Sequence, residues 1–374
     1  MGELSSDPGW ELGAGLGGAA LAAFADAVGR GPAAPELAWT SAIDLLRERS
    51  EFTGWLPQGP VSAGGSARLL RSSDGWVAVS LPRLDDLDLL PAWLGIEPLA
   101  PEDDRVPWGE LAAAVADRPG AWHAERAQEL GLAVAVVPQP GTVGAPDEQL
   151  EARGTVDPSR PYVRTTAGPA VPAGRTPEGL LVVDLSSLWA GPTCARLLAW
   201  AGARVVKVES TGRADGARLG NREFYRRLHE GQEERSVPFD TAEGRAELRD
   251  LLEQADVVIE GSRPRALTRL GIDPHEIVAG HPGAVWLAIT AHGRTGPRRQ
   301  WVGFGDDAAA AGGLVRWGPD GVPAFVGDAV ADPLTGLTAA ALVAGAVRDG
   351  GGVVIDIALR EVARAAALGA TVEW

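Results

Sequence analysis

Two aspartates, Asp328 and Asp332, lie within residues 325–347, a stretch that is otherwise made of small and apolar residues. From Pro333 onward the pattern predicts a helix, because proline is favoured in the first helical turn. Asp332 would then be the N-cap residue, where a carboxylate accepts backbone N–H bonds and meets the positive end of the helix dipole. Capping alone explains such a residue. Position alone does not say whether this carboxylate has a second role.

Residues 303–315 carry a second pair of acids, Asp306 and Asp307, with glycines on both sides of an alanine run. The acids could cap a closely packed helix, or the glycines could let the backbone approach a ligand. The Gly-Pro turn at 191–192 follows an apolar strand, and a helix start of this kind can bind an anion through free N–H groups. The sequence contains no dinucleotide fingerprint, P-loop or G-x-S-x-G elbow, so it gives no nucleotide or serine-hydrolase signature.

Composition excludes several other classes of site. The five histidines do not pair at metal-ligand spacing, and the single cysteine, Cys194, lies on an apolar helix face, so we expect no metal and no disulfide. A net charge of −16 argues against nucleic-acid binding. The longest apolar run, 12–29, is broken by Asp26, and the first ten residues lack a basic signal-peptide segment, so we expect no membrane contact and a cytoplasmic location. The abundance of glycine and alanine suggests a bacterial gene.

The elements that must position these residues fall into four segments. We expect a helical N-terminal segment at 1–60, a small α/β domain at 61–153, a Pro- and Gly-rich linker at 154–178, and a Rossmann-like domain at 179–374. The small domain should contain strands at 74–81 and 132–140 and helices at 107–118 and 121–131.

After the linker, strands alternate with helices. We expect strands at 179–186, 204–209, 256–261 and 284–290, and helices at 192–203 and 241–255. Continuous apolar strands joined by helices indicate a parallel sheet that is covered on both faces, and hence an α/β fold.

Together these stretches resemble the family III CoA-transferases, the group that contains formyl-CoA transferase, carnitine CoA-transferase and α-methylacyl-CoA racemase. The matching stretches follow the family order across about residues 179–360, and they are LLVVDLSSLWAGPTCARLLAWAGARVVKVES, ERSVPFDTAEGRAELRDLLEQADVVIEGSRPRALTRLGI, AVWLAITAHGRTGP, GFGDDAAAAGGLV and VADPLTGLTAA. The resemblance implies coenzyme A as the ligand, bound as an acyl-CoA substrate, with a carboxylic acid as the second substrate. It also implies an interlocked homodimer, for which residues 154–178 could serve as the threading linker.

In this family the aspartate before an LTG-like turn is the catalytic nucleophile, and Asp332 stands at that place. The resemblance implies that its carboxylate attacks the acyl-CoA thioester and then carries CoA as an aspartyl thioester. Helix-start N–H groups and glycine amides would stabilise the oxyanions, and they should keep Asp332 ionised at neutral pH.

The resemblance also indicates CoA-binding positions. These are the turn at Trp189, Ala190 and Gly191; Ser210 and Arg213 after the KVE motif; Gly261, Arg263 and Arg269 in the stretch related to ENF; Gly303 and Phe304; and the glycine loop at Gly64 and Gly65. Several depart from the family pattern, since Ser210 replaces a common arginine and Gly261 replaces asparagine. Arg213, Arg263 and Arg269 keep positive charge for the CoA phosphates or adenine.

The segment order departs from the family pattern, and Phe304 distinguishes between the possible functions. The small domain precedes the Rossmann-like domain instead of following it, which indicates a circular permutation. Phe304 stands where the transferases have tyrosine and the racemase has histidine, and a phenylalanine cannot transfer a proton. CoA transfer is therefore the favoured function. The alternatives are α-methylacyl-CoA racemase chemistry, and a non-catalytic homologue that only binds CoA thioesters.

Overall fold

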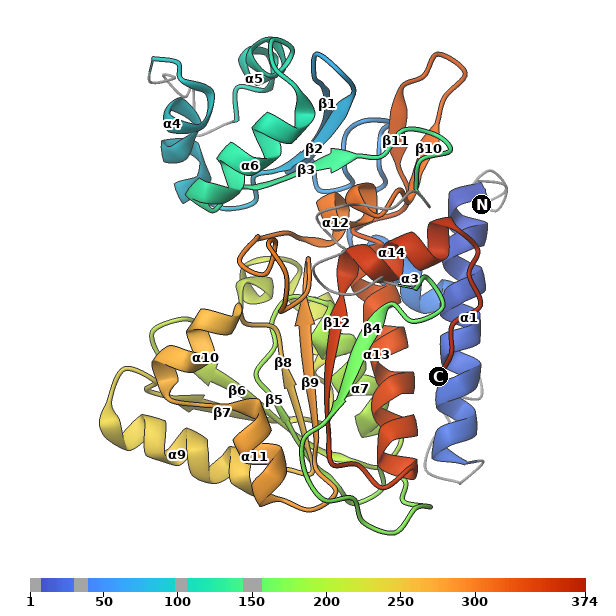
Figure 1. Cartoon of the computed structure of the whole chain (residues 1–374), viewed down its shortest axis with the longest axis vertical. Helices are drawn as coiled ribbons and strands as arrows, with labels where there is room; N and C mark the ends of the chain where they lie inside the picture. Colours follow the sequence, from blue (N-terminus) through green and yellow to red (C-terminus); the bar gives the residue numbers. More distant parts are fainter. Residues whose placement is uncertain (1–7, 30–39, 98–105, 144–156) are drawn as a thin grey trace.

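The computed structural model describes residues 8–29, 40–97, 106–143 and 157–374. A seven-stranded sheet forms the larger part of the molecule (Figure 1). In spatial order its strands are β4 (Tyr162–Thr166), β12 (Val353–Ala358), β9 (Val285–Thr290), β8 (Val257–Glu260), β5 (Leu181–Asp184), β6 (Arg204–Ser210) and β7 (Glu233–Val237). All neighbours from β12 to β7 are parallel, and β4 pairs antiparallel with β12. The α/β class and the parallel sheet expected from the sequence are confirmed.

Both faces of this sheet are covered, because successive residues of a strand point to opposite sides. In β5, Val182 belongs to the core on one face and Val183 to the core on the other. The helices on the first face are α7 (Ala190–Trp200), α13 (Ala331–Arg348) and α14 (Leu359–Ala367); those on the second are α9 (Ala242–Glu253), α10 (Pro264–Leu270) and α11 (Pro274–Gly280). Figure 1 shows α13 to the right of the sheet and α9 to α11 to its left.

The N-terminal part is helical, as expected. Helix α1 (Pro8–Val28) lies along α13, and its Leu16, Ala20 and Phe24 enter the same core as α13 (Figure 1). Helix α3 (Ala42–Thr53) begins with a capping box, in which Ser41 and Asp44 exchange hydrogen bonds between side chains and backbone. The N-terminal helices are thus built into the core of the large domain, and α3 lies at the end of α13 where the aspartates lie.

The segment 154–178, expected to be a linker, contains a strand. Residues 162–166 form β4, which extends the large sheet beyond β12 and gives it one of its two edges. Most side chains of β4 are exposed, so its sequence shows no alternation of apolar and polar residues.

The small domain is a three-stranded antiparallel sheet with helices on one face. Its strands are β1 (Ala67–Arg71), β2 (Trp76–Ser80) and β3 (Ala133–Val137), in that spatial order, and its helices are α4 (Leu90–Leu94), α5 (Trp108–Val115) and α6 (Gly120–Leu130). The second and third strands and the last two helices are those expected from the sequence.

The other face of the small sheet packs on helix α12 (Gly305–Ala311) and on β11 (Pro323–Phe325), which pairs with β10 (Val315–Trp317). Figure 1 shows α12 between the small sheet and the large domain. The start of α12 therefore lies at the junction of the two domains. No helix in the described ranges is long and apolar enough to cross a membrane.

Candidate active site

Asp332 lies in the first turn of α13. The helix begins at Ala331 and its N-cap residue is Val330, so Asp332 is inside the helix and its carboxylate makes no capping bond. The N-cap position expected from the sequence is therefore wrong. Its backbone N–H donates to the carbonyl of Ala329, 2.9 Å away. The side chain is partly buried and is free of a structural capping task.

Three further carboxylates surround Asp332. Asp306 and Asp307 come from the first turn of α12, and Asp328 lies just before α13. Asp307 and Asp328 are fully buried, and Asp306 accepts a hydrogen bond from the N–H of Ala329 at 3.0 Å. The sequence identified these acids as two separate pairs, and the structure brings all four together where α12 meets α13.

Arg49, from the N-terminal segment, enters this cluster. Arg49 of α3 donates from Nε to Asp328 Oδ2 at 2.6 Å and from its terminal nitrogen to Asp328 Oδ1. Its guanidinium also lies 4.8 Å from the centre of the Trp189 ring. Arg49 was not among the residues found from the sequence, because 279 positions separate it from its partner Asp328.

Burial makes several of these acids hard to ionise. It raises the pKa of Asp306, Asp307 and Asp332 to about 7 each. For Asp332, the charge of Arg49 lowers the pKa and the three neighbouring aspartates raise it. The expectation that helix-start amides keep Asp332 fully ionised at neutral pH is therefore wrong. Loss of water around the carboxylate outweighs the helix dipole, and Asp332 titrates near neutrality.

Gly305 allows this close approach. A Cβ atom at Gly305 would lie 2.6 Å from Asp332 Oδ2 and 2.5 Å from the carbonyl oxygen of Ala329, distances that no side chain tolerates. Ala329 itself has φ +44, a left-handed conformation that is uncommon for a residue with a side chain. The backbone of α12 is thus pressed against the carboxylate that the sequence identified as the nucleophile. Gly303 and Phe304, both expected near the ligand, immediately precede this contact.

The turn at Trp189, Ala190 and Gly191 is buried rather than exposed. Trp189 is 2% exposed and packs edge-on against Phe224 of α8 (Arg222–Leu228), with ring centres 5.2 Å apart. A Cβ at Gly191 would lie 1.9 Å from Ser186 Oγ, so glycine is required there for chain packing. Of the three, Trp189 lies beside Arg49.

A buried lysine fixes the loop that leads into this turn. Lys207 of β6 is fully buried, donates to the carbonyl of Ser186, and lies 3.3 Å from Asp215 Oδ2 and 3.7 Å from Asp184 Oδ2. Asp215 in turn accepts the N–H of Leu188, whose φ is +70. This role of Lys207 was not predicted from the sequence, in which residues 204–209 were expected only to form a strand.

Arginine side chains follow the carboxyl ends of β6 and β8. Ser210 is the last residue of β6, Gly261 follows β8 directly, and Arg213 and Arg263 come just after them. Neighbouring arginines, including Arg83 of the small domain, lower the pKa of Arg263, although burial is the larger cause.

In the part of the chain that the structure describes, Arg213 and Arg263 have no ion-pair partner. Arg83 lies 6.0 Å from the centre of the Phe304 ring and extends this basic group toward α12. It was not identified from the sequence. Arg269 lies in the last turn of α10, at the opposite end from Arg263.

The glycine loop lies beside the end of α3. Gly65 has φ +74 in the turn that Ser62 closes, and a Cβ at Gly64 would contact the Trp55 ring at 3.8 Å. Trp55 follows α3, which carries Arg49. The loop is thus connected to the aspartate cluster through α3.

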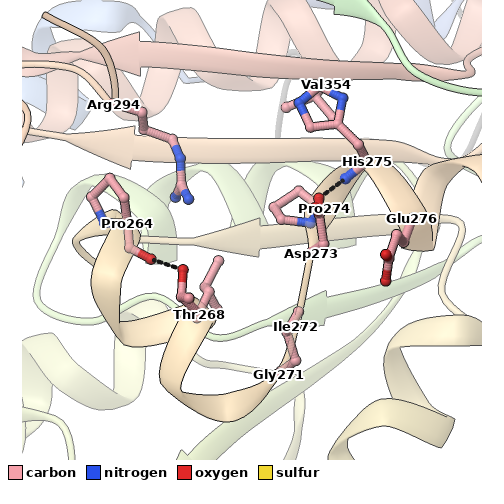
Figure 2. A pocket seen from close by; sticks show the side chains of 11 residues that line it. Pro264, Thr268, Gly271, Ile272, Asp273, Pro274, His275, Glu276, Arg294 and Val354 are labelled. Carbon is pink, nitrogen blue, oxygen red and sulfur yellow. Dashed lines mark hydrogen bonds between the residues drawn. The ribbon is translucent and has the colours of Figure 1, made fainter.

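A separate pocket of 440 Å³ lies between α10, α11 and the sheet (Figure 2). Arg294 points into it and forms an ion pair with the buried Glu260, whose pKa burial raises to about 7. None of the residues expected at the ligand site lines this pocket. The described residues include no group of three or more histidine, cysteine or acidic side chains placed to hold a metal ion.

Comparisons with known proteins agree on one family. The family model described as CoA-transferase family III matches residues 178–372. Succinyl-CoA–D-citramalate CoA-transferase of Chloroflexus aurantiacus is 34% identical over 197 residues, 49% of this chain and 49% of that protein. Succinate–glutarate CoA-transferase of Agrobacterium fabrum is 31% identical over 204 residues, 50% of this chain and 51% of that protein.

Among solved structures, a CAIB/BAIF family protein from Brucella suis is 30% identical, with a TM-score of 0.46 over 52% of this chain and 55% of that chain. The chain spans about half the length of the curated relatives it matches. The matched half contains α12, α13 and the large sheet apart from β4, whereas Arg49 and the small domain lie outside it.

Proposed function

Because the chain belongs to CoA-transferase family III, we propose that it moves CoA between an acyl-CoA and a carboxylic acid, with Asp332 as the nucleophile. The observation that carries this proposal is the position of Asp332: partly buried, without a capping bond, and pressed against the backbone of Gly305. A desolvated carboxylate that ionises near pH 7 is suited to attack a thioester held in line with it.

The proposed reaction proceeds through three exchanges. The Asp332 carboxylate attacks the thioester carbonyl, the CoA thiolate leaves, and a mixed anhydride forms. The thiolate then attacks the Asp332 carbonyl of the anhydride, which releases the first acid and leaves CoA as an aspartyl thioester. The acceptor carboxylate attacks this thioester, and the same steps in reverse yield the new acyl-CoA and free Asp332. No external oxidant or proton donor is consumed.

Charges around the site suit these steps. The Arg49 guanidinium lies beside the cluster and favours the ionised form of Asp332. We propose that it also stabilises the oxyanion formed at each carbonyl attack. Arg213 and Arg263, which have no carboxylate partner among the described residues, would hold the CoA phosphates, and Ser210 and Gly261 at the strand ends would line the nucleotide. Gly64 and Gly65 would cover the site as a loop.

The proposal also includes an interlocked homodimer, a cytoplasmic location and a family domain order that has been circularly permuted. Racemase chemistry is not proposed, because Phe304 offers no group that could move a proton. Sedimentation of the purified chain at micromolar concentration tests the dimer, and a stable monomer would contradict it.

Asp332→Asn tests the nucleophile. The substitution keeps the side-chain size and should reduce CoA exchange to background, while the fold survives because Asp332 makes no capping bond. Hydroxylamine or borohydride trapping after acyl-CoA treatment should modify the peptide that contains Asp332 in the wild type only. Asp349→Asn, at the opposite and exposed end of the same helix, is the matched control and should keep full activity. Activity in Asp332→Asn, or trapping at Asp306 or Asp328, would overturn the assignment.

A further inference from the structure

Glu260 is the last residue of β8, and its buried side chain joins two segments that follow different strands. Its Oε2 accepts the backbone N–H of Ser262 at 2.5 Å, and its Oε1 binds the guanidinium of Arg294, which comes after β9. The backbone N–H of Arg294 in turn donates to Asp356 Oδ2 on β12, 3.0 Å away. One carboxylate therefore ties the turn after β8 to the segment after β9.

The turn that Glu260 holds carries two of the residues expected to contact CoA. Gly261 and Arg263 lie on either side of Ser262 in the chain. A Cβ atom at Gly261 would lie 3.9 Å from Ser186 Cα, so this turn packs against the turn after β5. That second turn leads directly into residues 189–191, which are also expected at the CoA site. The two turns thus lie side by side at the carboxyl ends of neighbouring strands.

Arg263 lies among other positive charges. Burial, and after it the charges of Arg265, Arg83 and Arg213, lower the pKa of Arg263. Like charges repel one another, so a turn that keeps Arg263 in this position before an anion binds needs to be held in place. The hydrogen bond from the turn to the Glu260 carboxylate holds it at the peptide directly before Arg263.

Stability alone is a weak reason for a carboxylate at this point. Burial raises the pKa of Glu260 to about 7, although the charge of Arg294 lowers it. Residues 257–259 of the same strand are apolar, and a buried ion pair often stabilises a fold no more than apolar side chains of the same volume. Glu260 instead gives each of its two oxygens to a donor on a different segment, an arrangement that fixes position.

We propose, on the basis of the CoA transfer described above, that Glu260 is a positioning residue for CoA: it holds the turn 261–263 so that Arg263 meets a phosphate of the nucleotide end. Glu260 acts through Arg263 and has no part in the exchange steps at Asp332. Its loss should therefore weaken the binding of CoA and leave the rate at saturating CoA thioester nearly unchanged.

Glu260→Gln tests this role. The amide has the size of the carboxylate but one oxygen, so its NH2 group must face either the N–H of Ser262 or the guanidinium of Arg294, and one contact is lost. Calorimetry on the purified full chain measures Kd for CoA and for adenosine 3′,5′-bisphosphate, the nucleotide end without the thiol arm. We expect both Kd values to rise at least fivefold. In exchange of deuterated succinate into succinyl-CoA, KM for the thioester should rise similarly, with kcat changed less than twofold.

A double-mutant cycle separates positioning from a general structural effect. In an Arg263→Gln background, Glu260→Gln should weaken CoA binding less than twofold further, because the side chain that it positions is already gone. Arg294→Gln leaves Glu260 in place but removes its cation, and it should weaken both nucleotides in the same way if Glu260→Gln does not fold. Glu247→Gln, at an exposed ion pair with Arg235, is the control and should leave both Kd values unchanged.

Unchanged CoA affinity in Glu260→Gln would overturn the inference, and so would full additivity with Arg263→Gln. A fall in kcat with unchanged KM would also overturn it, because Glu260 would then act on the exchange steps. CoA binding without exchange of any acid would contradict the proposed CoA transfer, while the Kd values would still decide the role of Glu260. Absence of CoA binding by the unmodified chain would overturn both.

Discussion

Replacing Asp306 by asparagine should move the pH dependence of the reaction toward acid. Asp306 is one of the carboxylates that raise the pKa of Asp332, which is about 7. Asparagine keeps the oxygen that accepts the N–H of Ala329, so the local backbone should not change. Removing the negative charge makes Asp332 easier to ionise, and the midpoint of the activity profile should fall.

The expected change in activity follows from the ionised fraction of Asp332 at each pH. With a pKa of about 7, about 9% of Asp332 is ionised at pH 6. Asp306 and Asp332 titrate as a coupled pair, so we expect the substitution to lower the midpoint by roughly half to one unit. The ionised fraction at pH 6 then rises to about 24–50%, an increase of about three- to fivefold, while at pH 8 the change is below about 1.2-fold.

The assay is identity exchange of an acyl-CoA with its labelled acid between pH 5 and 9. Asp85→Asn, which removes an exposed acid of the small domain, is the matched control and should not move the midpoint. An unchanged or higher midpoint in Asp306→Asn would show that the charge of Asp306 does not act on the nucleophile. The reasoning from the carboxylate cluster would then be refuted.

Two further substitutions test the packing around the site, and the stability of Asp306→Asn at two pH values tests the titration of Asp306. Gly305→Ala should cost about 1–3 kcal/mol in the free energy of unfolding and reduce acyl trapping, since its Cβ would overlap Asp332; wild-type stability and trapping would contradict this close contact. Lys207→Met should lower the free energy of unfolding by about 3–5 kcal/mol, because it leaves buried acids unpaired. Arg204→Met, at an exposed ion pair, is the control and should lower it by less than about 1 kcal/mol. Equal losses in guanidinium unfolding would contradict the role of Lys207. Because the pKa of Asp306 is raised from 3.8 to about 7, its contribution to stability is complete below pH 3.8 and is lost as the pH rises through about 7. Asp306→Asn should therefore stabilise the fold more at pH 8 than at pH 4, by at most about 4 kcal/mol, and urea unfolding at the two pH values measures the difference.

The large sheet could be predicted because its signal is local. Strands such as β5 and β9 are continuous apolar runs between helices, and this pattern has few interpretations other than a covered parallel sheet. Strand β4 was missed because it lies at an edge, its side chains are mostly exposed, and its partner β12 follows nearly two hundred residues later in the chain. Its pairing uses backbone N–H and C=O groups, which nearly every residue carries, so the residue pattern does not reveal it.

The candidate site was predicted in part. Asp332 was assigned to the correct helix, but it lies two residues inside the observed cap, Val330, because capping preference does not fix the exact first residue of a helix. Arg49 could not be found, since its ion pair joins segments 279 positions apart. The raised pKa of Asp332 was missed for the same reason: burial by α12 and α3 is a property of the packed chain, whereas the helix dipole can be inferred from sequence.

The two edges of the large sheet have a consequence for self-association. Strand β7 exposes Glu233, Glu234 and Arg235, and β4 exposes Arg164 between Val163 and Thr165. Charged side chains along an open edge oppose the addition of a further strand from another molecule, which is the first step toward fibrils and precipitates. A second copy of the chain would therefore have to bind through helical or loop surfaces rather than by extending the sheet. Neutral substitutions at Glu233 and Arg235 would weaken this protection while leaving the distant carboxylate cluster untouched.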